Sequence, residues 1–105
     1  MLTQAEADGL LAMSKRFVSP PTVSLAPGVD DSYELASEDG KERFLLDVWR
    51  GVIRVSKLKY QNRAKKIVVL ARLDIDGSPH TNPDGAQLGG THLHLYREGY
   101  EDRWA

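Results

Sequence analysis

Residues 33–51 read YELASEDGKERFLLDVWRG, and this stretch decides the fold. Apolar and polar side chains alternate on both sides of Asp39-Gly40, a dipeptide typical of two-residue β-hairpin turns. We therefore predict an antiparallel hairpin centred on this turn. In its register, apolar side chains lie opposite each other, as Tyr33 does to Leu46 and Leu35 to Phe44. Opposite charges also face each other, as in the pair Glu38 and Lys41.

A second hairpin is predicted at Arg50-Gly51, where another apolar run follows a two-residue turn candidate. It pairs Val48 with Ile53, Leu46 with Val55 and Asp47 with Arg54. Both predicted registers put Phe44, Leu46 and Val48 on one face of the sheet. A slip by one residue would turn these side chains to the other face.

One later segment also alternates with period two: Ile67, Val69, Ala71, Leu73 and Ile75 predict a fourth long strand. Before the first hairpin, a loop is expected that contains one short strand, Thr22 to Ala26, between Pro21 and Pro27-Gly28. In the last strand we expect Leu93 and Leu95 to face the core. The opposite face is then polar, and carries His92, His94, Tyr96, Arg72, Asp74 and Arg54.

A helix is predicted at the N-terminus, because Thr3 and Glu6 have the spacing of a capping box. An apolar stripe follows from Ala7 to Val18, and Ser19-Pro20-Pro21 is expected to end the helix. The prediction is a single α+β domain over residues 1–105. In it the helix packs on one face of a mainly antiparallel, roughly five-stranded sheet.

Composition narrows the function classes. The chain of 105 residues has 14 basic and 15 acidic residues, so its net charge of −1 favours neither a strongly basic nucleic-acid binder nor an acidic DNA mimic. Without cysteine, thiolate nucleophiles and zinc–thiolate sites are excluded. Because no signal peptide or long apolar stretch is visible, we expect a cytoplasmic protein without a membrane partner.

All three histidines fall between residues 80 and 94. His92 and His94 are two apart on a strand, so they project to one side about 7 Å apart and can bind one metal ion. The candidate metal set is His92, His94 and Asp84, with His80, Asp74 or Glu98 as alternatives for the third ligand. Zinc is the ion we would expect there, and no other cofactor is predicted.

The same histidines also suit metal-free phosphodiester cleavage. One imidazole would remove the 2′-hydroxyl proton and the other would protonate the leaving oxygen. The candidate catalytic residues are His92, His94, His80 and Arg72, with Arg97 as an alternative to Arg72 for stabilising the phosphate. A third interpretation is a hydrogen-bonded polar sheet face without catalysis.

Residues 57–66 form a basic segment, expected at the connection between two strands. It could contact the phosphates of RNA or DNA while Tyr60 stacks on a base, or it could be a solvated hairpin end. Near the C-terminus, Tyr100 and Trp104 are expected to pack against the domain or against a partner. The candidate binding residues are Lys57, Lys59, Tyr60, Arg63, Lys65, Lys66, Arg97, Tyr100 and Trp104.

Several blocks together resemble a family of uncharacterised small bacterial proteins found in prophages and other mobile elements. They are FLLD (44–47), QNRA (61–64), RLD (72–74), PHTNPDG (79–85) and HLHLYREGY (92–100). The resemblance spans almost the whole chain and implies no settled activity. Family members tend to continue beyond residue 105, so this chain looks like a short member.

Two functional hypotheses follow from the residues and the resemblance. The first is a small anti-CRISPR-like inhibitor that binds a host defence protein or nucleoprotein complex. The alternative is a toxin-like ribonuclease or phosphodiesterase that uses the face with His92 and His94, with or without a bound metal. The oligomeric state is not predicted.

Overall fold

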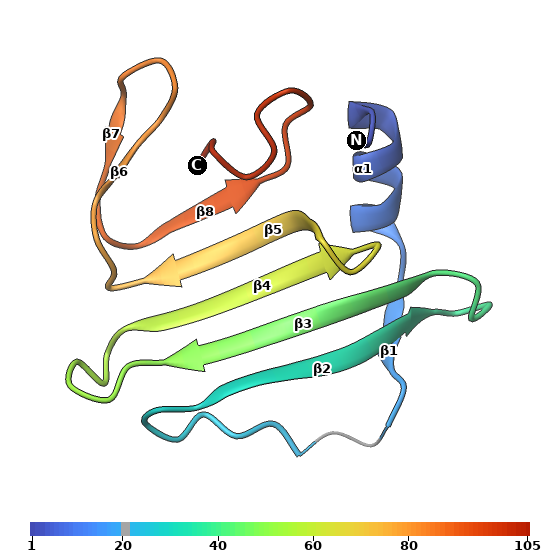
Figure 1. Ribbon diagram of the computed structural model, residues 1–105, viewed down its shortest axis with the longest axis horizontal. Coiled ribbons are helices and arrows are strands. Elements are labelled where there is room, and N and C mark those ends of the chain that lie inside the picture. The colour runs from blue at the N-terminus through green and yellow to red at the C-terminus, as the bar shows by residue number, and fades with distance from the viewer. Residues whose placement is uncertain (20–21) are drawn as a thin grey trace.

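The computed structural model describes residues 1–19 and 22–105. Six strands of the described residues form one antiparallel sheet in the order β1-β2-β3-β4-β5-β8, and β6 and β7 form a separate hairpin (Figure 1). The elements are α1 (Gln4–Ala12), β1 (Lys15–Phe17), β2 (Asp30–Ser37), β3 (Arg43–Arg50), β4 (Leu58–Ala64), β5 (Val68–Ile75), β6 (His80–Thr81), β7 (Gln87–Leu88) and β8 (His92–Leu95). The predicted α+β class is confirmed.

The β2–β3 hairpin has the predicted register. Tyr33 pairs with Leu46 and Leu35 with Phe44. Asp39 closes the turn, because its carboxylate accepts hydrogen bonds from the Ser37 hydroxyl at 2.6 Å and from the Lys41 backbone N–H at 3.0 Å. Gly40 has φ +74°, a left-handed conformation that glycine adopts without steric cost.

The second predicted hairpin is wrong. Leu46 pairs with Asn62 and Val48 with Tyr60, so the partner of β3 is β4 rather than residues 53–55. The intervening residues form a closed loop, in which the Gly51 N–H donates to the Lys57 carbonyl at 2.9 Å. A Cβ at Gly51 would lie 2.4 Å from the Arg54 carbonyl oxygen. Gly51 therefore permits a close approach of backbone within a longer loop.

The prediction also placed the basic segment wrongly. Most of residues 57–66 form the central strand β4 rather than a connection between strands.

In β5 the predicted alternation of buried and exposed side chains fails at the first positions. A register shift opposite Asn62 and Arg63 moves Leu70 into the core, where it is fully buried, while Ile67 is 82% exposed. Such a bulge places two residues of one strand opposite a single residue of its partner.

The N-terminal helix begins as predicted but ends early. Thr3 and Glu6 form the capping box. The helix stops at Ala12, and the Lys15 ammonium donates to the carbonyls of Leu10, Leu11 and Met13 at 2.8–3.0 Å, which satisfies carbonyl groups near the helix end. Phe17 therefore lies in β1, and residues 22–26 form no strand. Pro20 and Pro21 lie outside the described residues.

The core lies where α1 packs against one face of the sheet. Its buried residues are Ala7, Leu10, Leu35, Phe44, Ala64, Leu70 and Tyr96. Tyr96 was expected on the polar face, but it is buried in this cluster and its hydroxyl donates to the Leu2 carbonyl at 2.5 Å. Leu93 and Leu95 lie on the helix side yet stay 48% and 46% exposed. No helix in the described part is long and apolar enough to cross a membrane.

Candidate metal centre

Two rows of polar side chains cross the sheet on the face opposite α1. Directly paired residues of neighbouring strands point to the same side, so the register of β3, β4, β5 and β8 defines each row. The rows are Trp49-Lys59-Asp74-His92 and Asp47-Gln61-Arg72-His94. The sequence correctly predicted that Arg72, Asp74, His92 and His94 share a face.

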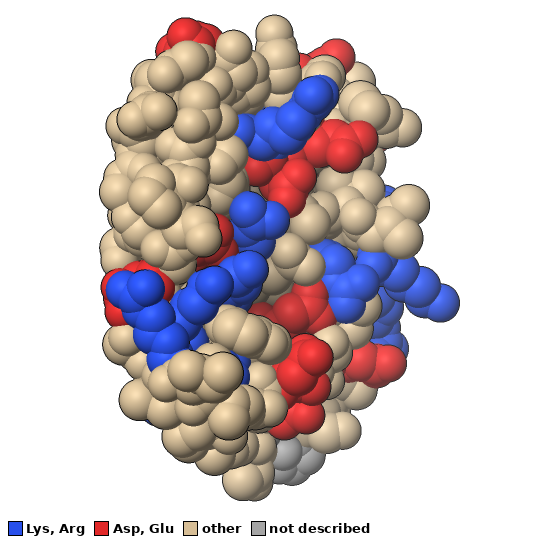
Figure 2. Space-filling view, turned by 60° about the vertical axis from the view of Figure 1, so that its left-hand side comes forward, with Lys and Arg blue, Asp and Glu red and all other residues tan. Residues whose placement is uncertain are grey.

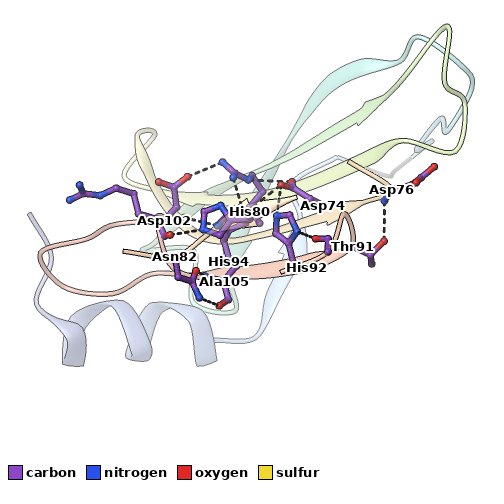
Figure 3. A network of polar contacts seen from close by, with 12 residues as sticks. Asp74, Asp76, His80, Asn82, Thr91, His92, His94, Asp102 and Ala105 are labelled. Carbon is purple, nitrogen blue, oxygen red and sulfur yellow. Dashed lines mark hydrogen bonds and ion pairs between the residues drawn. The ribbon is translucent and has the colours of Figure 1, made fainter. Parts of the chain in front are cut away.

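A third imidazole joins the end of these rows from the β6–β7 hairpin. The ring centroid of His80 lies 5.4 Å from that of His92 and 4.4 Å from that of His94, and the His92 and His94 rings are 4.8 Å apart. One ring nitrogen from each histidine lies within 4.8 Å of the others. Figure 3 shows the three rings gathered beside Asp74.

The cluster is covered rather than open. His94 is 1% exposed, His92 is 8% exposed and His80 is partly exposed, whereas a metal-free nuclease would leave its two catalytic imidazoles open to solvent. The segment after β8 closes one side, and the hairpin closes another. Asn82 holds these two together, because its amide exchanges two hydrogen bonds with the backbone of Ala105, at 2.9 and 2.8 Å (Figure 3).

Each histidine places one ring nitrogen against a backbone carbonyl. The contacts are His92 Nδ1 to Gly89 at 2.7 Å, His94 Nδ1 to Asp102 at 2.7 Å and His80 Nε2 to Arg103 at 2.8 Å. A carbonyl oxygen can only accept, so each of these nitrogens carries a hydrogen. In a neutral imidazole the other nitrogen then presents a lone pair.

The lone pairs of His92 and His94 face a buried carboxylate. Asp74 Oδ2 lies 3.2 Å from His92 Nε2 and 3.5 Å from His94 Nε2. Its other oxygen, Oδ1, is buried without a hydrogen-bond partner in the described part of the chain. Arg72 donates to the free nitrogen of His94, whereas the lone pair of His92 and the carboxylate repel each other unless a proton or a metal cation lies between them.

Arg72 supplies the nearest positive charge. Its guanidinium lies 3.0 Å from His94 Nε2 and 3.0 Å from the Asp102 carboxylate, and its Nε is 3.3 Å from Asp74 Oδ1. Burial lowers the pKa of His94 below its ordinary value, and the nearby charge of Arg72 lowers it further. A neutral His94 keeps the lone pair that metal binding needs.

The third member of the cluster is therefore His80 rather than Asp84. Asp84 lies in the turn of the β6–β7 hairpin and accepts a hydrogen bond from the Ala86 N–H at 2.9 Å. The other alternative, Glu98, accepts from the Gln4 N–H at 2.7 Å. The sequence named His80 as a candidate but carried no signal for the three orienting carbonyls.

The predicted binding residues are distributed over several places. Lys57 and Lys59 lie 5.8 and 5.6 Å from the ring centroid of Trp49, and Tyr60 is on the other face of β4, opposite Val48. Lys65 pairs with Glu42 at 3.0 Å, and the Lys66 carbonyl accepts from Arg63. Near the C-terminus, Arg97 stacks on Trp104 at 4.1 Å and Tyr100 meets the same ring edge-on.

Arg63 belongs to an ion pair on the polar face. Its Nε lies 2.6 Å from the carboxylate of Asp47. Burial alone would raise the pKa of Asp47, but hydrogen bonds from Arg63, Ser32 and Gln61 together hold it below its usual value. Basic and acidic side chains are intermingled on the side of the molecule shown in Figure 2. The view shows no broad surface of a single charge.

Comparison with known proteins adds a family but no function. The model of DUF6978, a family of unknown function, matches residues 2–105. No curated protein and no solved structure matches the chain.

Proposed function

The chain belongs to DUF6978, a family of unknown function, and we propose that this member binds a divalent transition-metal ion of the zinc class through His80, His92 and His94. One observation carries the proposal. The free ring nitrogens of His92 and His94 lie next to Asp74, a buried carboxylate, and one ring nitrogen of His80 lies within 4.8 Å of a nitrogen of each of them. A cation at this point would satisfy the lone pairs and the carboxylate together.

Two separations around Asp74 suit a tetrahedral ion, whereas the histidine nitrogens, which lie within 4.8 Å of one another, would have to move closer together to bind it. Zinc bound to nitrogen or oxygen at 2.0–2.1 Å gives ligand–ligand separations of about 3.3 Å in a tetrahedron. The observed separations from Asp74 Oδ2 to His92 and His94 are 3.2 and 3.5 Å. Asp74 is thus the fourth ligand in this proposal. Arg72 keeps its contact with Asp102 and gives up the one with His94.

The surroundings favour a structural role for the ion. A metal-bound histidine typically donates its second ring nitrogen to a carbonyl or carboxylate, and all three histidines do so here. With three imidazoles and one carboxylate the coordination is complete, whereas a hydrolytic centre keeps a position open for water. The ion would hold the β6–β7 hairpin and the segment after β8 against the sheet.

Metal content of untagged protein tests the proposal directly. Purified wild type, stripped with a chelator and dialysed against zinc, should bind one equivalent, and cobalt should give the absorption of a tetrahedral site. His80→Ala and His92→Ala should each lose stoichiometric binding. Asp84→Ala is the matched control, because Asp84 lies on the same hairpin and should bind as wild type does.

Two results would overturn the metal site. The first is a folded wild-type protein, verified by circular dichroism, that takes up no equivalent of zinc or cobalt. The second is undiminished binding in the two histidine variants. In either case a proton between His92 and Asp74 would account for the geometry.

The histidine cluster bears on only one of the two functional hypotheses drawn from the sequence. Direct acid–base cleavage of RNA is disfavoured, since His94 is almost completely buried. Inhibition of a host defence component stays a prediction, because the geometry of the cluster does not bear on it.

A further inference from the structure

The outer half of the same polar face contains a hollow next to the histidine cluster. Its volume is about 230 Å³, and it is lined by Asp47, Trp49, Lys59, Gln61 and Arg72. These residues come from the three central strands β3, β4 and β5, so the walls are held by paired backbone. Arg72 belongs to the hollow and to the cluster, which makes the two sites neighbours.

An aromatic ring with free cations forms one wall. Trp49 is flanked by the ammonium groups of Lys57 and Lys59, at 5.8 and 5.6 Å from its ring centroid. Among the described residues neither lysine has a salt bridge, whereas Arg54 and Arg63 are both paired with aspartates. The two lysines are therefore the cations available to an anionic ligand.

Asp47, the acidic residue that lines the hollow, would not repel an anionic ligand, because the positive charge of Arg63 neutralises its carboxylate. Asp47 receives two hydrogen bonds from Arg63, at 2.6 and 2.8 Å. It also accepts from the Gln61 amide nitrogen at 2.9 Å. This contact orients Gln61 and leaves its carbonyl oxygen as an acceptor in the wall, which suits the exocyclic amine of a nucleobase.

We propose that this hollow binds a nucleobase together with its phosphate. The base stacks on Trp49 and displaces the lysine ammonium groups that lie over the ring, so that Lys57 and Lys59 hold the phosphate instead. Aromatic stacking combined with a few cations is the usual way in which proteins bind single-stranded nucleic acid. The ligand is either a free nucleotide or one unit of a single strand. The inference does not depend on the metal centre.

Fluorescence of Trp49 provides the test. Trp104→Phe removes the other tryptophan, so that emission reports on the hollow alone. Chelator-treated protein is titrated at low salt with UMP, AMP, a ten-residue oligouridylate, a duplex of matched length and inorganic polyphosphate. We expect saturable quenching by the single strand, and neither duplex nor polyphosphate should bind as tightly. Mononucleotides that bind as tightly as the oligonucleotide identify the free nucleotide as the ligand.

Labelled oligonucleotide binding gives the energetic test. Trp49→Ala should weaken binding by roughly fivefold to a hundredfold, while Trp49→Phe should retain most of it. Lys57→Gln together with Lys59→Gln should reduce the slope of log affinity against log salt by roughly 1.4. Lys65→Gln, a lysine already paired with Glu42, is the control and should bind as wild type does.

The proposal is wrong if the single strand fails to quench Trp49 at low salt. It is equally wrong if polyphosphate competes as well as the oligonucleotide does, or if Trp49→Ala, folded by circular dichroism, binds with unchanged affinity. Because the metal is removed beforehand, none of these results bears on the histidine centre.

Discussion

Two aspartates on the polar face have opposite surroundings. Asp47 in β3 accepts hydrogen bonds from Ser32, Gln61 and Arg63, at 2.6 to 2.9 Å. Asp74 in β5 faces histidine nitrogens and has an unpartnered buried oxygen. Its nearest cation is the Arg72 guanidinium, which lies 3.3 Å from that oxygen and also pairs with Asp102, so the charge of Asp74 is less well compensated than that of Asp47. The first aspartate has its full set of hydrogen-bond donors, and the second is where the proposed cation would bind.

The largest effect should come from removing the satisfied aspartate. Asp47→Ala leaves the partly buried Arg63 and Gln61 without their acceptor, and should lower the free energy of unfolding by about 2–3 kcal/mol. Urea denaturation measures it. Lys65→Ala, which removes an exposed ion pair, should cost only about 0–1 kcal/mol. Equal losses in the two variants would contradict the distinction.

The unsatisfied aspartate should behave differently. In the metal-free protein, Asp74→Asn replaces the carboxylate with an amide that can donate to a histidine lone pair, so stability should stay constant or rise by up to about 1 kcal/mol. The same variant should lose part of the stabilisation that zinc confers on wild type. Urea denaturation with and without zinc measures both. A loss of stability without zinc would mean that the charge of Asp74 already stabilises the metal-free fold, through its contacts with Arg72 and His92.

The smallest expected effect is on how the stability of the fold depends on acidic pH. The pKa of Asp47 is lower in the folded protein than its ordinary value near 3.8, so the folded state resists protonation more than the unfolded state does. Its contribution to stability is complete above that ordinary value and is lost as the pH falls through the lowered one. Asp47→Asn should therefore show a shallower decline of stability with acid in this range, measured by urea denaturation at several pH values. If the free energy of unfolding fell with pH equally steeply in wild type and Asp47→Asn, the pKa of Asp47 would not be lowered in the folded protein.

The pattern of side chains predicted part of this contrast. Period-two alternation correctly placed Arg72, Asp74, His92 and His94 on one face, because strand geometry alone determines sidedness. Burial could not be inferred in the same way. The histidines are covered by a hairpin and by the segment after β8, whose docking depends on contacts far apart in the chain, such as Asn82 with Ala105.

The turn rule gave the right register at one glycine and the wrong one at another. At the first, the connection is longer than the predicted two-residue turn, because the Gly40 N–H donates to the Ser37 carbonyl. Gly40 follows an aspartate whose carboxylate closes the turn locally, so neighbouring residues suffice to specify the hairpin. Gly51 is needed because the Arg54 carbonyl approaches it, a contact that no dipeptide rule contains. Because the prediction did not include that loop, its register is wrong for every residue after Gly51. For the same reason the lysine-rich segment was not recognised as a central strand.

The origin of the orienting carbonyls affects when the metal centre can form during synthesis. They belong to residues 89, 102 and 103, which leave the ribosome after β1 to β5. The larger part of the sheet can thus pair while the histidines still lack their orientation. If the proposed ion binds, its capture is a late event in maturation, and metal occupancy would distinguish a fully folded chain from one in which only the sheet has formed.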